Sequence, residues 1–212
     1  MPLTPQKTIE RLILYRLLLE NLEQQGTANT FSNQLADLSG NTSAQVRRDL
    51  MTVGYLGNPR HGYKISELLN GIRTLLEPKQ GISMVVVGIG NLGRAILGYF
   101  YPLKPKFNLV AAFDNDEHKV NRVISGCRTY PVNQIASVLS GTIIDLGIIS
   151  VPADQAQGTA NLLIRTGIKG LVNFSPAPVK VSGNVYLENM HMTMTFEKVV
   201  YFSRLFRTGG TQ

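Results

Sequence analysis

Apolar and polar positions alternate in blocks along the second half of the chain. Short apolar runs rich in β-branched residues are each typical of a buried strand, and they occupy residues 84–87, 109–114, 146–151 and 170–174. The segments between them have helical spacing, at residues 94–100, 134–139 (with Asn133 as the expected cap) and 154–165. Strands that alternate with helices predict a doubly wound parallel sheet of the α/β class.

The first 77 residues have a different pattern, in which apolar positions recur every three or four residues. Helices are expected over residues 4–25, 33–38, 44–51 and 67–76. Ser32, Thr42 and Ser66 stand where the last three of these helices need a capping side chain. Gln45 follows Thr42 at the spacing of a capping box.

The turn-rich residues 54–63 predict a hairpin beside the two short helices, so this half is expected to be a winged helix-turn-helix. Arg47 and Arg48 lie in the first turns of its second helix. Exposed arginines are common on solvated helices, but this position favours contact with DNA. The polar Ser43 and Gln45 beside them, and Arg60 in the hairpin, are the further expected DNA-binding residues.

A glycine-rich turn directly follows the first strand of the second half. Gly88, Gly90 and Gly93 form the spacing Gly-x-Gly-x-x-Gly, and the next strand ends on Asp114, 26 residues after the first glycine. Strand, glycine turn, helix and terminal acid together are the dinucleotide fingerprint of a Rossmann domain. Gly90 would let backbone N–H groups approach a pyrophosphate, and Asp114 would accept hydrogen bonds from a ribose. Loss of the ligand, or coenzyme A in its place, is the alternative.

In a parallel sheet the ligand site lies beyond the carboxyl ends of the strands. The expected cofactor-binding residues are therefore the following: Gly88, Gly90, Asn91, Leu92, Gly93, Asp114, Val151, Pro152, Asn173 and Phe174.

Charge alone does not identify a DNA-binding half. The 212 residues carry a net charge of +7, but residues 1–77 hold eight Lys and Arg against seven Asp and Glu, leaving +6 in residues 78–212. No apolar run is long enough to span a membrane and no signal core begins the chain, so a cytoplasmic protein without a membrane partner is expected. The single cysteine, Cys127, excludes an internal disulfide and is expected to be a buried packing residue.

An enzyme that used a nicotinamide would need an acid or base beside it. The three histidines are His61 in the hairpin, His118 in the loop after Asp114, and His191 near the C-terminal helix, and none ends a sheet strand. No spacing of Cys and His fits a metal site. No catalytic residue and no metal are expected.

Residues 190–206 predict a helix with more large apolar residues than one exposed helix face needs. It either packs on its own domain or docks into a partner subunit, and the sequence favours neither.

Six stretches of the chain together carry a resemblance to the Rex family of redox-sensing transcriptional repressors: residues 45–50, 90–95, 111–114, 151–153, 156–157 and 167–174. The resemblance implies a homodimer that binds NAD(H) and releases operator DNA when NADH binds. It implies a winged-helix domain at residues 1–77, a Rossmann domain at 78–189, and a C-terminal dimerisation helix at 190–212 swapped into the other subunit.

The chain departs from the family pattern at two places. In the hairpin, Pro59 stands where the family has Arg, and Arg60 is displaced by one position. Before the C-terminal helix, His191 replaces an Asp that, in the family, contacts the counterpart of Tyr99 in the NADH state and an arginine, matched here by Arg16, otherwise. A neutral imidazole supplies no negative charge to hold Arg16, so weaker discrimination between NADH and NAD⁺ is expected.

Three functions therefore remain to be compared. The first is an NAD(H)-responsive DNA-binding repressor. The second is a small NAD-dependent oxidoreductase, which lacks an identified catalytic base. The third is a nucleotide-binding protein with weakened DNA recognition.

Overall fold

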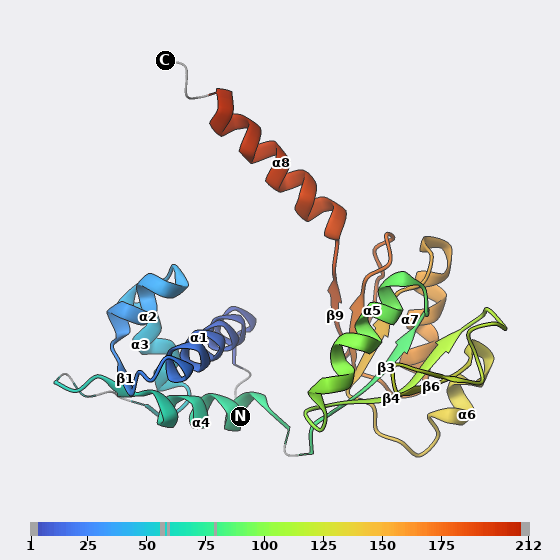
Figure 1. The fold of residues 1–212 in the computed structure, drawn as a ribbon, viewed down its shortest axis with the longest axis horizontal. Coiled ribbons are helices and arrows are strands. Elements are labelled where there is room, and N and C mark those ends of the chain that lie inside the picture. The colour runs from blue at the N-terminus through green and yellow to red at the C-terminus, as the bar shows by residue number, and fades with distance from the viewer. Residues whose placement is uncertain (1–3, 56–57, 59, 79, 209–212) are drawn as a thin grey trace. The chain divides into compact units, whose positions relative to one another are not determined.

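The computed structural model describes residues 4–55, 58, 60–78 and 80–208 (Figure 1). The chain divides into two units, residues 1–79 and 80–212. The first unit contains α1 (Gln6–Gln24), β1 (Asn29–Thr30), α2 (Ser32–Ser39), α3 (Ser43–Met51), β2 (Tyr63–Lys64) and α4 (Ile65–Leu76).

Helical spacing builds the core of the first unit. Leu12, Tyr15 and Leu19 recur at three and four along α1 and are fully buried. They pack with apolar side chains of α2, α3 and α4, which include Leu35, Val46, Leu50, Leu68, Leu69 and Ile72. β1 and β2 pair antiparallel, with Asn29 opposite Lys64. The predicted helix-turn-helix is confirmed, whereas the pairing of β1 with β2 was not predicted.

Two of the predicted caps in this unit are wrong. Ser32 begins α2 instead of capping it, because Phe31 holds the N-cap position and its N–H donates to Gln34 Oε1 at 3.0 Å. α4 begins at Ile65, one residue before Ser66, because the pairing of β2 with β1 keeps the backbone extended up to Lys64.

The second unit is a seven-stranded sheet flanked by helices. Its strands are β3 (Ile82–Val87), β4 (Phe107–Asp114), β5 (Val123–Ile124), β6 (Cys127–Pro131), β7 (Leu146–Ile149), β8 (Gly170–Asn173) and β9 (Tyr186–Asn189). Its helices are α5 (Asn91–Phe100), η1 (Tyr101–Leu103), η2 (Val132–Gln134), α6 (Ile135–Val138), η3 (Ala153–Gln155), α7 (Ala156–Arg165) and α8 (Met192–Thr208).

The strand order is β5-β6-β4-β3-β7-β8-β9, and every neighbouring pair is parallel except β5 with β6. The six parallel strands taken in chain order therefore lie 3-2-1-4-5-6, the doubly wound Rossmann order. The predicted fold class is confirmed. Three strands, β5, β6 and β9, were not predicted, because they are short and mix polar with apolar residues.

Alternate residues of β3 divide the core between the two faces of the sheet. Val85 and Val87 belong to the cluster that contains residues of α6 and α7, whereas Met84 and Val86 belong to the cluster that contains Ile96 of α5. Two helix starts differ from the prediction. Asn133 lies inside η2 rather than capping a helix, and residues 153–155 form η3 before α7 begins.

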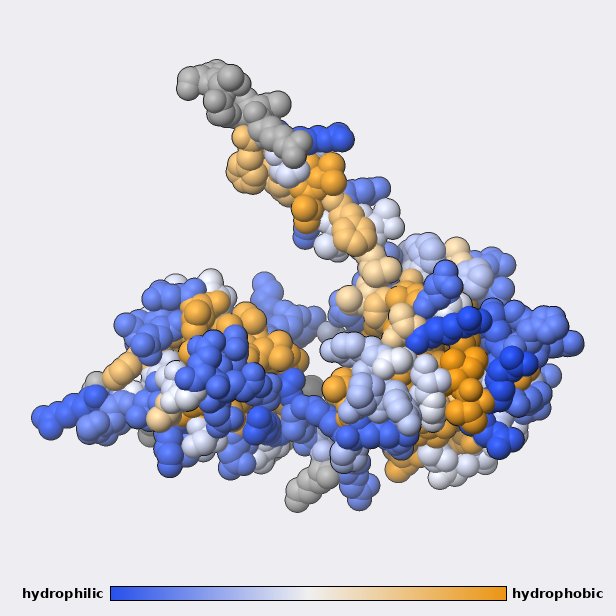
Figure 2. Space-filling view, in the orientation of Figure 1, coloured by the Kyte–Doolittle hydropathy of each residue, from blue (hydrophilic) through white to orange (hydrophobic). Residues whose placement is uncertain are grey.

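α8 projects as a single helix in Figure 1 and shows apolar side chains in Figure 2. Every side chain from Met192 to Phe206 is exposed, including Phe196 at 68% and Phe206 at 82%. The described residues of the chain therefore leave the apolar positions of this helix uncovered, and packing on its own domain is not what the structure shows.

Within the described residues, no helix is both long and apolar enough to cross a membrane. The same residues contain no cluster of three or more His, Cys, Asp or Glu arranged to hold a metal ion.

Candidate nucleotide and DNA sites

A cavity of about 630 Å³ opens at the carboxyl ends of β3, β4, β7 and β8. Eight of the ten predicted cofactor-binding residues line it: Gly88, Gly90, Asn91, Leu92, Asp114, Val151, Pro152 and Phe174. Its remaining lining residues were not predicted, and they are Asn115, Asp116, Lys119, Val132, Ser150, Gln155, Thr159 and Pro176. Several of these directly follow a strand, so a wider window at each strand end would have found them.

The three glycines of the turn have separate roles. Gly88 has φ +94°, and a Cβ there would collide with the Ser150 carbonyl. Gly93 lies under the turn, because a Cβ on it would strike the Gly88 carbonyl oxygen, and so it does not line the cavity. Gly90 has open space around its Cβ position. The turn thus needs Gly88 and Gly93 for its own shape and leaves room beside Gly90.

α5 begins beside Gly90 without a side-chain cap. The first-turn N–H groups of a helix have no partner within the helix, and the helix dipole makes this end positive. Asn91 and Leu92 of this turn line the cavity. The cavity therefore offers an anion such as a pyrophosphate a helix N-terminus without a competing side chain.

Asp114 connects the end of β4 to the glycine turn. Its Oδ2 accepts a hydrogen bond from Ile89 N–H at 2.6 Å, and its Oδ1 accepts one from Asp116 N–H at 2.9 Å. Lys119 Nζ lies 3.6 Å from Asp114 Oδ2 and 3.2 Å from Asp116 Oδ2. The carboxylate lines the cavity and also holds the turn in place.

Asn173 is fully buried and does not line the cavity. Its side-chain N–H groups donate to the Ala177 carbonyl and to Asn189 Oδ1, both at 2.8 Å, while its Oδ1 accepts from Ser175 N–H. Asn173 therefore shapes the loop that follows β8 and holds it against β9.

The second helix of the helix-turn-helix, α3, begins at a cap that was predicted correctly. Thr42 Oγ1 accepts a hydrogen bond from Gln45 N–H at 3.2 Å. The return half of the capping box is wrong, because the Gln45 side chain instead donates to Asp49 Oδ1 at 2.9 Å. Sequence spacing does not reveal this choice, since it depends on what surrounds Asp49.

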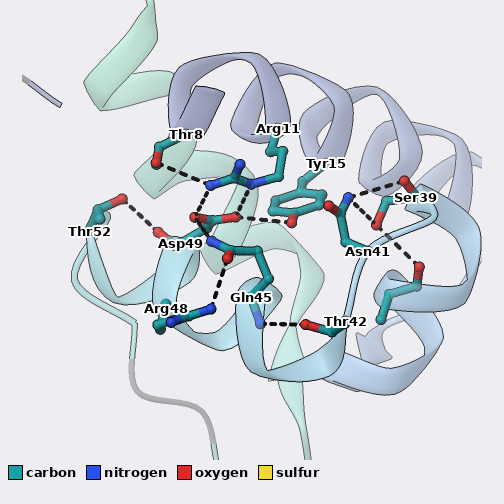
Figure 3. A network of polar contacts seen from close by, with 11 residues as sticks. Thr8, Arg11, Tyr15, Ser39, Asn41, Thr42, Gln45, Arg48, Asp49 and Thr52 are labelled. Atoms are coloured by element: carbon teal, nitrogen blue, oxygen red, sulfur yellow. Dashed lines mark hydrogen bonds and ion pairs between the residues drawn. The ribbon is translucent and has the colours of Figure 1, made fainter. Parts of the chain in front are cut away.

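Asp49 is the centre of a polar network between α1 and α3 (Figure 3). It is only 2% exposed and accepts from Arg11 Nε at 2.6 Å, from Arg11 Nη2 at 2.8 Å and from the Tyr15 hydroxyl at 3.1 Å. Burial by itself would raise the pKa of Asp49, but the bonds from Arg11, Gln45 and Tyr15 hold that pKa below its ordinary value. Burial and the bond to Asp49 raise the pKa of Tyr15 to about 12.

The predicted DNA-binding side chains of α3 lie on its accessible surface. Arg47 and Arg48 are exposed, and Ser43 and Gln45 are half-buried. Arg47 Nη1 donates to Ser32 Oγ at 3.2 Å, and Arg48 Nη2 donates to Gln45 Oε1 at 2.9 Å.

The predicted wing closes at Asn58 and Gly62, which exchange two backbone hydrogen bonds. Asn58 Oδ1 accepts from Arg60 N–H at 2.8 Å, and Arg60 is exposed at this turn. The parts of the wing at residues 56, 57 and 59, including the family departure at Pro59, lie outside the described residues.

The three predicted switch residues are divided between the units. Arg16 lies in the first unit, where its Nη1 pairs with Glu77 Oε1 at 2.5 Å. Tyr99 is 67% exposed on α5. His191 lines a second cavity, of about 520 Å³. This cavity shares the lining residues Phe174 and Pro176 with the cavity at the carboxyl ends of the strands.

Cys127 is buried at 1% exposure in the β3–α5 core, and burial raises the pKa of its thiol to about 11. This agrees with the packing role expected from the sequence.

Fold and sites together define a two-domain protein that joins a winged helix to a Rossmann domain of the dinucleotide-binding type. A family model described as "CoA binding domain" matches residues 79–177, and one described as "Putative DNA-binding protein N-terminus" matches residues 4–50.

Relatives that match over nearly their whole length identify the family more specifically than these two models do. The redox-sensing transcriptional repressor Rex of Carboxydothermus hydrogenoformans is 36% identical over 197 residues, covering 93% of this chain and 95% of the relative. That of Exiguobacterium sp. is 32% identical and covers 98% and 95%. The crystal structure of RSP in complex with β-NAD⁺ and operator DNA matches with a TM-score of 0.87 at 32% identity, over the whole of both chains. RSP with β-NADH matches at 0.84 and 31%, over 98% of this chain and 99% of RSP.

The chain belongs to the Rex family of redox-sensing transcriptional repressors.

Proposed function

We propose that this protein is a cytoplasmic, homodimeric repressor that binds operator DNA and releases it when NADH occupies its Rossmann domain. One observation carries the proposal. A cavity beside an uncapped helix N-terminus and a helix-turn-helix with exposed arginines occur in one chain. The match of that whole chain to RSP, whose structures contain β-NAD⁺, β-NADH and operator DNA, supports it.

The proposed NAD(H) site uses the cavity at the strand ends. The pyrophosphate takes the N–H groups at the start of α5 beside Gly90, and the adenosine ribose meets Asp114. Val151, Pro152 and Phe174 also line the cavity, and the nicotinamide is assigned to them. Gly88, Gly93 and Asn173 support the site indirectly. The two glycines shape the turn, and Asn173 shapes the loop after β8.

The proposed DNA surface consists of α3 and the wing. Arg47, Arg48 and Arg60 are exposed cations, and they are assigned to base edges or phosphates. Ser43 and Gln45 at the start of α3 complete the surface.

The proposed domains are a winged helix at residues 1–77, a Rossmann domain at 78–189 and a dimerisation segment at 190–212. The exposed apolar side chains of α8 between Met192 and Phe206 support a dimer in which this helix is covered by the second subunit. The proposed switch consists of Tyr99, His191 and Arg16. Arg16 pairs with Glu77 within the first unit.

We propose a regulator rather than an enzyme. His61 belongs to the wing, and His118 does not line the cavity at the carboxyl ends of the strands. His191 lies in the neighbouring cavity and is assigned to the switch.

The proposal is tested with an operator selected by the wild-type protein from a library of random duplexes. Binding of that operator is titrated with NADH, NAD⁺ and coenzyme A. We expect NADH to release the DNA at a lower concentration than NAD⁺ and coenzyme A to have no effect. Release by coenzyme A alone would replace the proposed ligand, and failure to select any sequence would remove the repressor function.

Two glycine variants locate the ligand. Gly90→Ala fits the fold, since nothing lies within 4 Å of its Cβ position, but it places a methyl group where the pyrophosphate is assigned. We expect it to weaken NADH binding at least tenfold while the operator still binds. The control is Gly98→Ala inside α5. The Cβ that it adds would lie 3.9 Å from Ser125 Oγ, which is an ordinary van der Waals contact. Equal NADH affinity in both variants would place the ligand elsewhere.

A further inference from the structure

The side chain of Gln45 is occupied at both ends. Its Nε2 donates to Asp49 Oδ1 at 2.9 Å, and its Oε1 accepts from Arg48 Nη2 at 2.9 Å (Figure 3). A glutamine that reads adenine does so through both ends of the amide at once. In this structure those ends are bound within the protein.

The orientation of the Gln45 amide is dictated by its two partners. Asp49 is a carboxylate with a lowered pKa and only accepts hydrogen bonds, so the NH₂ group must face it. Arg48 is a guanidinium and only donates, so the amide oxygen must face it. A side chain with a donor at one end and an acceptor at the other is what this position requires.

The anchor of this arrangement lies in α1. Asp49 is held by both Arg11 and Tyr15, and it is almost completely buried. Arg47 has no comparable support, because its partner Ser32 supplies a single hydroxyl at the start of α2. Of the two arginines, Arg48 is therefore the one whose position is fixed through a buried group.

We propose that Gln45 is a positioning residue for Arg48 and not a base reader, so that a polar chain from Arg11 through Asp49 and Gln45 sets specificity at the one base pair that Arg48 reads. This rests on the proposed DNA-binding function. Gln45 occupies one of the donors of Arg48, and the guanidinium keeps enough for a bidentate contact with guanine. Ordering the arginine before DNA binds reduces the side-chain entropy lost in the complex.

The test compares operators mutated at each base pair against four variants of the full chain: Gln45→Met, Arg48→Met, the double variant and Arg47→Met. Met is unbranched and forms helices well, so α3 is expected to remain folded. Gln45→Met should weaken operator binding by about three- to thirtyfold, the range of side-chain ordering. It should relax preference at the same base pair as Arg48→Met, and the double variant should bind no worse than Arg48→Met alone.

Two further readouts separate positioning from general damage to the helix. Gln45→Met removes no cation, so the slope of log affinity against log salt should stay that of wild type, whereas a lost phosphate contact would flatten it. Arg47→Met is the matched control, and it should not change preference at the Arg48 base pair.

Gln45→Glu is a second, independent test of whether residue 45 reads a base or positions Arg48. A glutamate that reads DNA prefers cytosine, so a base-reading position 45 would acquire a new preference at its own base pair. A positioning residue would instead change preference only where Arg48 acts. The proposal is overturned if either Gln45 variant alters a different base pair, or if the Gln45 and Arg48 effects multiply in the double variant.

Failure of the proposed DNA-binding function would give other results than failure of the positioning role. If wild type selects no operator, or if Arg47→Met and Arg48→Met both bind it as wild type does, then α3 does not read DNA and both proposals are wrong. If Arg48→Met relaxes one base pair and Gln45→Met relaxes none, only the positioning role is wrong.

Discussion

Replacing Arg11 with Met tests how strongly α1 is held to the helix that carries the DNA-binding arginines. Arg11→Met removes two hydrogen bonds to Asp49, at 2.6 and 2.8 Å, and leaves that carboxylate with Gln45 and Tyr15 alone. The Asp49 side chain is 3% exposed, so water cannot replace the guanidinium freely.

The magnitude follows from burial. Removing one partner of a buried ion pair costs about 3–5 kcal/mol, because the other charge is left uncompensated. The Arg11 side chain is 22% exposed, and two neutral donors to Asp49 remain, so the lower end of about 3 kcal/mol is expected. That is a large part of the roughly 5–15 kcal/mol that stabilises a typical domain.

Hydrogen exchange on the full chain measures the effect without assuming that both domains unfold together. The protected amides of α1 and α3 should exchange about 100-fold faster in Arg11→Met, and those of β3 and β4 should not change. Arg73→Met is the control. It removes a surface pair with Glu20, whose partners are 43% and 29% exposed, and it should cost about 0–1 kcal/mol.

The pH dependence has a definite sign. The folded-state pKa of Asp49 lies below its unfolded value, so the ion pair stabilises the domain above the unfolded pKa. That stabilisation is lost as the pH falls through the lower, folded-state pKa. The difference between wild type and Arg11→Met should therefore shrink on acidification below about pH 4. Exchange in α1 and α3 that accelerates less than fivefold at pH 7 would refute the reasoning.

Four other outcomes are expected. The Cys127 thiol has a pKa raised to about 11, so iodoacetamide at pH 8 should alkylate it far more slowly than in the unfolded chain; equal rates would contradict its burial. Asp114→Ser should lower the preference for NADH over NADPH in calorimetry, because it removes the charge that repels a 2′-phosphate; an unchanged ratio would argue against ribose contact. His191→Asp should widen the gap between the NADH and NAD⁺ concentrations that release operator DNA, and an unchanged gap would assign the switch to another residue. Ending the chain at Asn189, which keeps β9, should give monomers or aggregates in light scattering, whereas a soluble dimer would exclude α8 from the interface.

The sequence by itself determined those features whose cause is local. The apolar runs of β3, β4, β7 and β8 were placed within a few residues, because a strand buried on both faces requires continuous apolar side chains. The turn that begins at Gly88 was found for a similar reason, since its backbone excludes a Cβ. The Thr42 cap also needs only the next three residues.

Only the tertiary structure decided what depends on residues far apart in the chain. β6, which lies next to one edge of the sheet, and the edge strand β9 owe their conformation to neighbours that supply backbone hydrogen bonds, and their own sequences carry weak patterns. Arg11 and Asp49 are 38 positions apart, so no helical spacing indicates that they meet. Gln45 was predicted to complete a capping box, and instead it faces Asp49. A buried carboxylate attracts the nearest available donor more strongly than a solvated helix end does, and the packing of α1 on α3 is what buries it.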